Sequence, residues 1–261
     1  MDQRPIGVFD SGSGGLTAVR EIRSILPFEN IIYFGDTARV PYGGRSAEIL
    51  LKYARQDVRF LRSHDIKAIL VACGTVSTNA LPVLAAENDI PVLGVVEPSC
   101  AAAAAACEAL GYEPMILTDC LCCEAREAGS MLASIARTHA RDGKNLAFLM
   151  GGETVVHLRG KGLGGRNQEI ALSAALGIEG LSNALVFSVG SDGTDGPTDA
   201  AGGIADGETA QLMRQKGVDA VKSLNDNDAY HALDAVGGLL KTGATGTNVN
   251  DVTVLLLRAA E

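Results

Sequence analysis

Two side chains able to move protons stand at the ends of predicted strands in the first third of the chain. Asp10 follows the apolar run 5–9 and opens the glycine-rich turn 11–15, and Cys73 ends the apolar run 67–72. The start of a helix lowers the pKa of a thiol there, which predicts that Cys73 is a reactive thiolate. Free N–H groups at the glycine turn suit a carboxylate or a phosphate. Together these residues predict a carboxylate and a thiolate beside an anion-binding turn.

The same residues also have a purely structural interpretation. The turn 11–15 is not a dinucleotide-binding fingerprint, because Thr17 stands where the third glycine should fall, and it lacks the Gly-Lys-Ser/Thr of a P-loop. It can therefore be an ordinary strand-to-helix turn. Cysteine is also among the residues most often buried for packing alone, so Cys73 can be a core residue. The residue pattern leaves both interpretations open.

A second group of polar residues surrounds a glycine cluster in the other half of the chain. Arg159, Lys161 and Arg166 flank or interrupt the glycines of 160–165, just before a predicted helix. Positive charge and exposed N–H groups at a helix start form a candidate phosphate cradle.

Two further loops contain carboxylates and amides at expected strand ends. The acidic loop 190–203 contains Asp192, Asp195 and Asp199, and the loop 242–251 contributes side-chain amides and turn glycines. Mg²⁺ prefers one or two carboxylates together with phosphate oxygens, so the acidic loop can hold a metal–nucleotide complex. These residue types suit phosphoryl transfer, although surface turns rich in turn-forming residues remain the alternative.

Alternating strands and helices must position the first group of residues. Apolar strands separated by helices of this length predict a parallel, flavodoxin-like or Rossmann-like sheet covered on both faces. The first and third strands of such a sheet are commonly neighbours, which predicts that Asp10 and Cys73 lie side by side. The predicted strands are 5–9, 30–34, 67–72 and 91–95, and the predicted helices are 16–26, 46–62 and 75–87.

The character of the sequence changes near Pro98, which predicts two α/β lobes, 1–98 and 99–261. Six consecutive alanines, 101–106, follow this boundary and favour a helix over a flexible linker. The remaining predicted strands are 114–117, 146–150, 154–158, 184–189 and 252–257, and the remaining helices are 124–138, 166–176 and 229–236.

Composition limits the class of protein. The chain has 261 residues, 47% apolar and 20% charged, a formal net charge of −9, and six cysteines. The acidic balance argues against a nucleic-acid partner, and neither a signal peptide nor a membrane-spanning run is recognisable. We therefore expect a cytoplasmic protein with reduced thiols. Cys120, Cys122 and Cys123 have no neighbouring His, so no metal site is predicted from them.

Residues 5–98 resemble the first half of a glutamate racemase. Four motifs carry the resemblance: IGVFDSGSGGL, IIYFGDTARVPYGGRS, VACGT and IPVLGVVEP. It implies a cofactor-independent amino-acid site with Cys73 as a catalytic thiol and Asp10 as its assisting carboxylate. The implied substrate-binding residues are Ser11, Pro41, Tyr42, Gly43, Gly74 and Thr75. The family more often has Asn in place of Gly74, and its second thiol lies in a Cys-Thr-His motif that this sequence lacks.

Residues 100–261 resemble the C-terminal MOFRL domain of the glycerate 2-kinases. The matching segments are GYEPMILTDCLCCEAREAG, GGETVVHLRGKGLGGRNQE, SVGSDGTDGPTDAAGG, NDAYHAL and TGATGTNVNDV. The resemblance implies that Arg166, Asp192 and Asn248 are this domain's catalytic contributions, acting with ATP and Mg²⁺. The family's active site also needs an N-terminal domain that carries a lysine and a glycine–serine phosphate loop, and the racemase-like lobe stands in its place.

These resemblances predict a fusion of two α/β enzymes, with impaired turnover in both halves because each resembles only part of a two-sided site. Three alternatives remain: residual glycerate kinase activity, residual glutamate racemase activity or Cα proton exchange through Cys73, and a non-catalytic binding or scaffold module. The expected partners are small molecules, namely glutamate or glycerate together with ATP, without nucleic acid or membrane. The sequence leaves a homodimer open.

Overall fold

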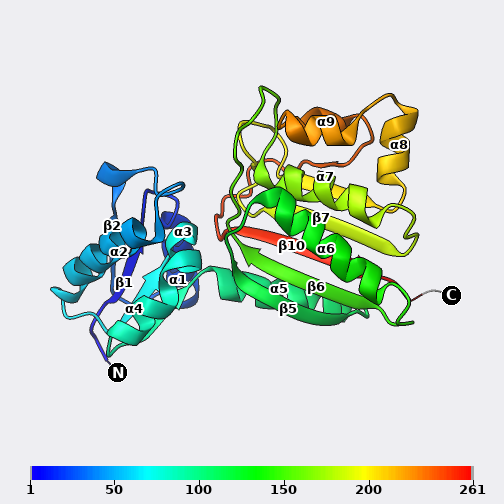
Figure 1. The fold of residues 1–261 in the computed structure, drawn as a ribbon. Coiled ribbons are helices and arrows are strands. Elements are labelled where there is room, and N and C mark those ends of the chain that lie inside the picture. Colours follow the sequence, from blue (N-terminus) through cyan, green and yellow to red (C-terminus); the bar gives the residue numbers. More distant parts are fainter. Residues whose placement is uncertain (1, 260–261) are drawn as a thin grey trace. The chain divides into compact units, whose positions relative to one another are not determined.

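The computed structural model describes residues 2–259 and divides into two compact units (Figure 1). Unit 1 comprises the chain up to Ser99 together with the segment Gly246–Asn250. Unit 2 comprises Cys100–Thr245 and the chain from Asp251 onward. The mixed strands and helices of both units confirm the predicted α/β class.

Unit 1 is built on a four-stranded parallel sheet with the strand order β2-β1-β3-β4. Its strands are β1 (Ile6–Asp10), β2 (Ile31–Gly35), β3 (Ala68–Val71) and β4 (Val92–Gly94). This is the order of a flavodoxin-like sheet, and it confirms the prediction that the first and third strands are neighbours.

The helices of unit 1 follow the predicted pattern with one difference. They are α1 (Leu16–Ile25), a 3-10 turn (Thr37–Arg39), α2 (Ala47–Arg62), α3 (Gly74–Asn79) and α4 (Leu81–Glu87). The single predicted helix 75–87 is wrong, because the helix breaks at Ala80. Pro82 has no N–H for the carbonyl of Thr78, and its ring would crowd that carbonyl, so the backbone ends one helix and starts another.

The core of unit 1 lies on one side of its sheet. Helices α2, α3 and α4 bury apolar side chains there, among them Leu61, Val76 and Leu84, against Phe9 and Val71 from the strands. Helix α1, by contrast, contains no buried residue. Helices were predicted on both faces of the sheet. Helix α1 follows β1 in the predicted order along the chain, but it covers its side of the sheet only loosely.

Unit 2 has a six-stranded mixed sheet with the order β5-β6-β10-β7-β8-β9. The strands are β5 (Glu113–Leu121), β6 (Leu146–Gly152), β7 (Ala184–Gly190), β8 (Gly202–Asp206), β9 (Leu239–Leu240) and β10 (Asp251–Leu257). Strand β10 runs antiparallel to both β6 and β7 and lies between them.

Two strand predictions for unit 2 are wrong. The predicted strand 154–158 is only an isolated bridge between Val155 and Glu124. Strand β8 begins inside the predicted loop 190–203, because Gly202 and Gly203 pair with β7, and a Cβ at Gly202 would lie 1.9 Å from the carbonyl oxygen of Ser188. Glycine is therefore required there by close backbone approach, and it does not mark a loop.

Helices cover both faces of the unit 2 sheet. Helix α5 (Val96–Ala109) packs on one face through Cys107, and α6 (Ala125–His139) with α7 (Arg166–Ile178) packs on the other. Pro98, the predicted boundary, lies in the first turn of α5, where proline is tolerated.

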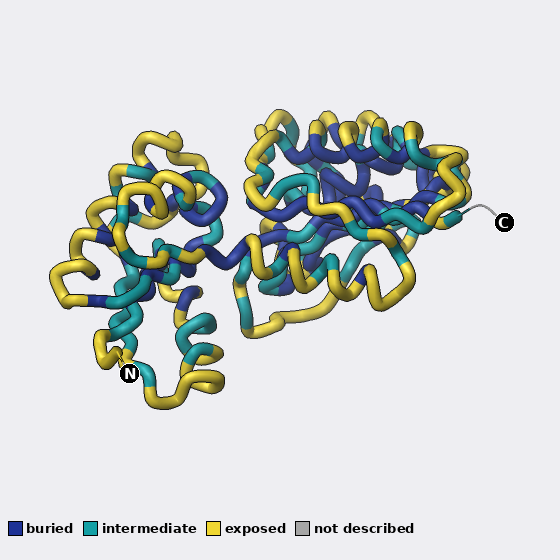
Figure 2. Tube along the Cα trace, turned by 90° about the horizontal axis from the view of Figure 1, so that it is seen from below, coloured by how far each residue is buried: buried dark blue, intermediate teal, exposed yellow. Residues whose placement is uncertain are grey.

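Three short helices that the sequence signals largely missed, α8 (Thr209–Gln215), α9 (Ala220–Asn225) and α10 (Ala229–Asp234), complete the fold. They pack on the side of α7 that faces away from the sheet, so α7 is buried almost all round. Figure 2 shows the buried interior of unit 2 in dark blue. Of these three, only α10 was predicted, as part of 229–236. Within residues 2–259, none of the helices is long and apolar enough to cross a bilayer.

Replacing Leu84 tests the one-sided core of unit 1. Leu84 is fully buried in α4, whereas its neighbour Val83 is 39% exposed. We expect Leu84→Ala to destabilise unit 1 by about 2–5 kcal/mol because it leaves a cavity, and Val83→Ala to change stability by less than about 0.5 kcal/mol. Urea unfolding measures both variants, and equal effects would contradict the assigned core.

Candidate functional site

The first candidate site lies at the carboxyl ends of β1 and β3. Cys73 Sγ donates to Ser11 Oγ at 3.4 Å, and Ser11 Oγ donates to Asp10 Oδ1 at 3.4 Å. Asp10 and Cys73 are both buried, and Ser11 is half-buried. The pairing of β1 with β3 thus connects a thiol, a hydroxyl and a carboxylate in one chain of contacts.

The glycine turn is shaped by Asp10. Asp10 Oδ2 accepts the Gly15 N–H at 2.9 Å, and a Cβ at Gly15 would lie 2.8 Å from the Cβ atoms of Asp10 and Ala72. Only glycine fits this approach. At least one N–H of the predicted anion-binding turn is therefore taken by the chain's own carboxylate.

Burial in this structure opposes the predicted thiolate at Cys73. Burial raises the pKa of the Cys73 thiol above its ordinary value, and this effect outweighs the hydrogen bonds to Ser11 and to the Val76 N–H, which lower it. Burial of Tyr33 itself, together with the nearby Asp10 and Cys73, raises the pKa of Tyr33 to about 12. Helix α3 is only six residues long, so its start does not compensate for the loss of water.

The other residues implied for the amino-acid site differ in how far they are buried. Pro41 and Gly43 are exposed, but Tyr42 is a core residue whose hydroxyl donates to Asp36 and, at 3.2 Å, to Asp57. Burial raises the pKa of Tyr42, which keeps its hydroxyl protonated. The Tyr42 side chain thus points into the core, and only its backbone remains available to a ligand.

Gly74 and Thr75, both half-buried, begin α3 directly after Cys73. Gly74 lies against the carboxamide of Asn250, a residue of the segment Gly246–Asn250 that sequence reasoning did not select. Asn250 stands two residues after Asn248 in the same loop motif, and this position was the signal in the sequence that could have selected it.

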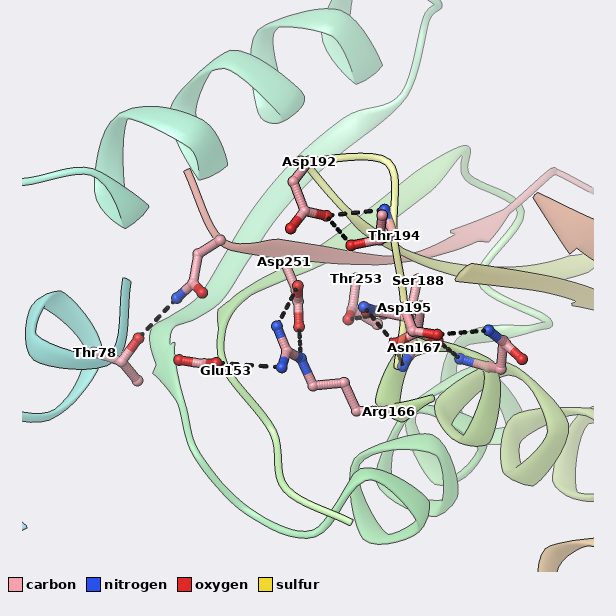
Figure 3. A network of polar contacts seen from close by, with 12 residues as sticks. Thr78, Glu153, Arg166, Asn167, Ser188, Asp192, Thr194, Asp195, Asp251 and Thr253 are labelled. Atoms are coloured by element: carbon pink, nitrogen blue, oxygen red, sulfur yellow. Dashed lines mark hydrogen bonds and ion pairs between the residues drawn. The ribbon is translucent and has the colours of Figure 1, made fainter. Parts of the chain in front are cut away.

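The second candidate site is centred on Arg166, the first residue of α7. Arg166 Nε lies 2.5 Å from Asp251 Oδ2, its Nη2 lies 3.1 Å from Asp251 Oδ1, and its Nη1 lies 3.2 Å from Glu153 Oε1 (Figure 3). Although burial disfavours the charged form, the Asp251 carboxylate raises the pKa of Arg166, so the guanidinium stays charged. Burial raises the pKa of Asp251, although Arg166 lowers it.

Asp251 and Glu153 are site residues that sequence reasoning missed. Asp251 is the first residue of β10, and Glu153 follows the last residue of β6. Each stands at a strand end beside a glycine- or amide-rich loop, and that position was the only signal in the sequence.

Asp192 lies beside this ion pair in unit 2. Its Oδ1 accepts the N–H and the hydroxyl of Thr194 at 2.9 and 3.0 Å. A Cβ built on Gly190 would lie 3.3 Å from Asp192 Oδ1, 3.4 Å from Asp251 Oδ1 and 2.6 Å from the carbonyl oxygen of Thr194. The Gly190 backbone therefore lies close to the Asp192 and Asp251 carboxylates, and carboxylate oxygens are donors that Mg²⁺ prefers.

The other carboxylates of the acidic loop do not join Asp192. Asp195 is buried and accepts the N–H groups of Asn167 and Gln168 at 3.1 and 2.9 Å, which caps the start of α7. Asp199 accepts from the Tyr230 hydroxyl at 2.7 Å and from Lys241 at 3.0 Å. The structure therefore does not gather the three aspartates of the acidic loop at one place, because Asp195 and Asp199 each have other partners.

The predicted phosphate cradle at 159–166 is also wrong. The backbone N–H groups of Arg159 and Gly160 donate to Asn227 Oδ1 at 2.7 and 3.0 Å. Those of Lys161 and Leu163 donate to the carboxylates of Asp226 and Asp228 at 3.1 and 2.9 Å. The chain's own oxygens thus occupy the donors that a phosphate would need, and only Arg166 of the predicted cradle takes part in the site.

Asn248 lies in the segment that groups with unit 1, and its Oδ1 accepts the Asn250 N–H at 3.4 Å. Elsewhere, Cys73, Cys100 and Cys107 are buried and Cys120, Cys122 and Cys123 are exposed. Among the side chains of residues 2–259, no three His, Cys, Asp or Glu groups converge in a way that could hold a metal by themselves.

Comparison with known proteins separates the chain into two parts. Residues 146–251 match the MOFRL family. The D-glycerate 2-kinase of Thermotoga maritima is 48% identical over 173 residues, which are 65% of this chain and 42% of that protein. A crystal structure of glycerate kinase from Thermotoga maritima superposes with a TM-score of 0.70 at 27% identity, over 98% of this chain and 92% of that one.

The glutamate racemase of Thermus thermophilus is 54% identical over 99 residues, which are 38% of either protein. These findings confirm both resemblances: a glutamate racemase-like segment and a MOFRL-containing segment similar to glycerate 2-kinases share one chain. The chain spans about two fifths of the length of each of these two curated relatives.

The pH dependence of stability tests the burial of Asp195. Burial raises its pKa from 3.8 to about 6. Between about pH 4 and 6 the folded state keeps a proton that the unfolded state releases, so this contribution to stability is complete below about pH 4 and is lost as the pH rises through 6. Relative to Asp195→Asn, wild type should lose about 3 kcal/mol across this window in urea unfolding.

Asp199→Asn is the matched control for this experiment. Asp199 is exposed, and its hydrogen bonds to Tyr230 and Lys241 lower its pKa, so it titrates below this window. A difference between wild type and Asp195→Asn that stays constant from pH 4 to 6 would contradict the assignment.

Proposed function

We propose that the chain is a fusion of a glutamate racemase lobe, residues 1–98, with the C-terminal domain of a glycerate 2-kinase, residues 99–261. The observation that carries this proposal is the match of each curated relative over only about two fifths of its own length. The change from one similarity to the other falls within the chain, near the start of α5. Both parental activities are impaired, because each site has lost its opposite wall.

The glycerate kinase-like unit retains anion binding at Arg166. The guanidinium is charged, and its Nε, Nη2 and Nη1 atoms pair with Asp251 and Glu153. Its remaining Nη hydrogens would receive a phosphate or the glycerate carboxylate, with bound Mg²⁺ offsetting the two neighbouring carboxylates. Asp192 would hold Mg²⁺ near Gly190, where its carboxylate lies close to that of Asp251. Bound Mg²⁺–ATP would supply the transferable phosphoryl group, and Asn248 would orient the substrate.

Turnover of glycerate is impaired because the racemase-like lobe supplies no suitable lysine. Its lysines are Lys52 and Lys67. Lys67 pairs with Glu29 and donates to the carbonyl oxygen of Asp2 at 3.0 Å, just before β3 and so at the opposite end of that strand from Cys73. Lys52 lies within α2 and is exposed. Neither stands at a strand end that carries candidate site residues.

Nucleotide binding tests the kinase-side proposal. At a concentration of Mg²⁺–ATP about 100 times its Kd, we expect stabilisation by about 2.7 kcal/mol in thermal melts, with ADP release in the presence of D-glycerate far below that of a complete glycerate kinase. Arg166→Ala should weaken binding at least about tenfold, since it removes a charge-assisted contact.

Arg137→Ala is the control, because Arg137 donates to the carbonyl oxygen of Gly177 on the surface of α6 and α7. Protection that survives Arg166→Ala would refute the assigned site. Absence of both ADP release and nucleotide protection in wild type would leave the non-catalytic scaffold interpretation.

A second candidate function, proton exchange at the Cα of glutamate, rests on the contacts among Cys73, Ser11 and Asp10. Inverting a carbon centre without a cofactor needs a base on one face and an acid on the other. Cys73 is the single cysteine of residues 1–99, so the lobe contributes a thiol to one face only. One-sided exchange without racemisation is the expected residual chemistry.

Deuterium incorporation tests this second candidate. In D₂O, we expect the Cα proton of a single glutamate enantiomer to exchange, with no change in optical rotation, and Cys73→Ala to abolish the exchange. Cys107→Ala, which removes another buried thiol, should leave it unchanged. Exchange into both enantiomers would show that a second base is present and would refute the half-site.

A further inference from the structure

The hydroxyl of Tyr33 is hydrogen-bonded to the glycine-rich turn 11–15 of unit 1. Tyr33 lies in β2, and its Oη donates to the carbonyl oxygen of Gly12 at 2.8 Å. Strand β2 pairs with β1 in a register that sets Gly35 opposite Asp10, the residue from which the turn begins. A side chain of the neighbouring strand, 21 positions along the chain, therefore holds the backbone of the turn.

Gly35 allows the turn to come this close to β2. A Cβ at Gly35 would collide with the carbonyl oxygen of Gly12 and would lie 3.3 Å from Tyr33 Cε1. Tyr33 and Gly35 are two residues apart in one strand, so they lie on the same face of the sheet. Phe34, between them, points to the opposite face, where it packs against the core of unit 1. The Gly12 carbonyl group therefore lies against the β2 backbone, on the face away from that core.

Apolar packing of α1, the helix that follows the turn, contributes little to holding it. Helix α1 contains no buried residue, and Leu16, its first residue, is 50% exposed. A helix usually fixes the segment before it by burying an apolar stripe, which α1 does not do. The turn depends instead on two hydrogen bonds to side chains of the sheet. Asp10 Oδ2 accepts the Gly15 N–H at 2.9 Å, and Tyr33 Oη donates to Gly12.

Ser11, the residue before Gly12, connects the Cys73 thiol to the Asp10 carboxylate. Ser11 and Gly12 share a peptide bond, so a displacement of Gly12 moves the Ser11 backbone. The contact from Ser11 Oγ to Asp10 Oδ1 is 3.4 Å, already longer than most O–H···O bonds, so a small displacement would break it. The titratable groups that face the thiol are Asp10 of β1 and Tyr33 of β2.

We propose that Tyr33 is a positioning residue for the thiol site of unit 1, because its hydroxyl fixes Gly12 and, through Gly12, the adjacent Ser11. Ser11 is thereby kept between Cys73 and Asp10, where its hydroxyl can stabilise the thiolate during proton transfer. Tyr33 acts through the turn and not on the substrate. The proposal stands on residues of unit 1 alone and rests on the second candidate function, proton exchange at the Cα of glutamate.

The pH profile of Cys73 alkylation tests this inference on the full chain. Because the chain has six cysteines, labelling by iodoacetamide is followed on the Cys73 peptide by mass spectrometry. The hydrogen bond to Ser11 lowers the pKa of Cys73, so its loss should shift the midpoint upward by about one pH unit in Ser11→Ala and in Tyr33→Phe. The double variant should match Ser11→Ala alone, because Tyr33 acts through Ser11.

Deuterium incorporation into glutamate gives the functional readout. Tyr33→Phe should lower kcat for Cα exchange about tenfold, in line with a thiolate fraction reduced by one pH unit, and should leave KM unchanged. Tyr53→Phe is the matched control, because Tyr53 lies in α2, where its ring packs against the Arg39 guanidinium and the core of unit 1. It should change neither the alkylation profile nor the exchange rate.

The two readouts separate the possible failures. An unshifted alkylation profile in Tyr33→Phe, or shifts that add in the double variant, would overturn the positioning role. A raised KM with an unchanged kcat would overturn it as well, since it would place Tyr33 in substrate binding. If wild type exchanges no glutamate proton, the second candidate function fails, while alkylation of Cys73 still decides whether Tyr33 acts through Ser11.

Discussion

The ion pair between Arg166 and Asp251 is the interaction on which unit 2 most depends. Arg166 begins α7, the helix buried almost all round, and Asp251 begins β10, the strand between β6 and β7. Asp251 is buried and Arg166 is half-buried, so removing Arg166 would leave the Asp251 carboxylate without its charged partner. The same pair fixes the orientation of the guanidinium. Fold and candidate site therefore share one interaction, so the contacts that stabilise the fold also keep the candidate site in place.

Much of the fold could be predicted because apolar runs and helical periodicity are local signals. The four parallel strands of unit 1 were recognisable as short apolar runs between helical segments. The general rule for doubly wound sheets then placed β1 beside β3. The misses have physical causes. Helices α8 and α9 are short and lie on α7 rather than on the sheet, so they lack a clear amphipathic repeat. Strand β8 begins with two glycines that resemble a turn but pair closely with β7.

The site was less predictable, because it depends on burial and on contacts between distant residues. Adjacent strands bring Asp10 and Cys73 together as expected, but burial opposes the thiolate that the start of a helix would favour. The glycine-rich cluster resembled a phosphate cradle, yet residues 226–228, more than sixty positions away, supply oxygens to its N–H groups. Asp251 could not be distinguished from other loop polar residues, because its role comes from strand pairing.

Each unit thus contains one connected group of polar side chains. In unit 1 this is a buried thiol linked through Ser11 to a carboxylate, and in unit 2 it is a guanidinium between two carboxylates. Phosphorus-31 NMR of the protein with Mg²⁺–ATP and D-glycerate tests most directly whether binding persists without efficient turnover. We expect shifted or broadened ATP resonances and no accumulating phosphomonoester signal. A phosphoglycerate signal that grows at the rate of a complete kinase, or ATP resonances identical to those without protein, would contradict it.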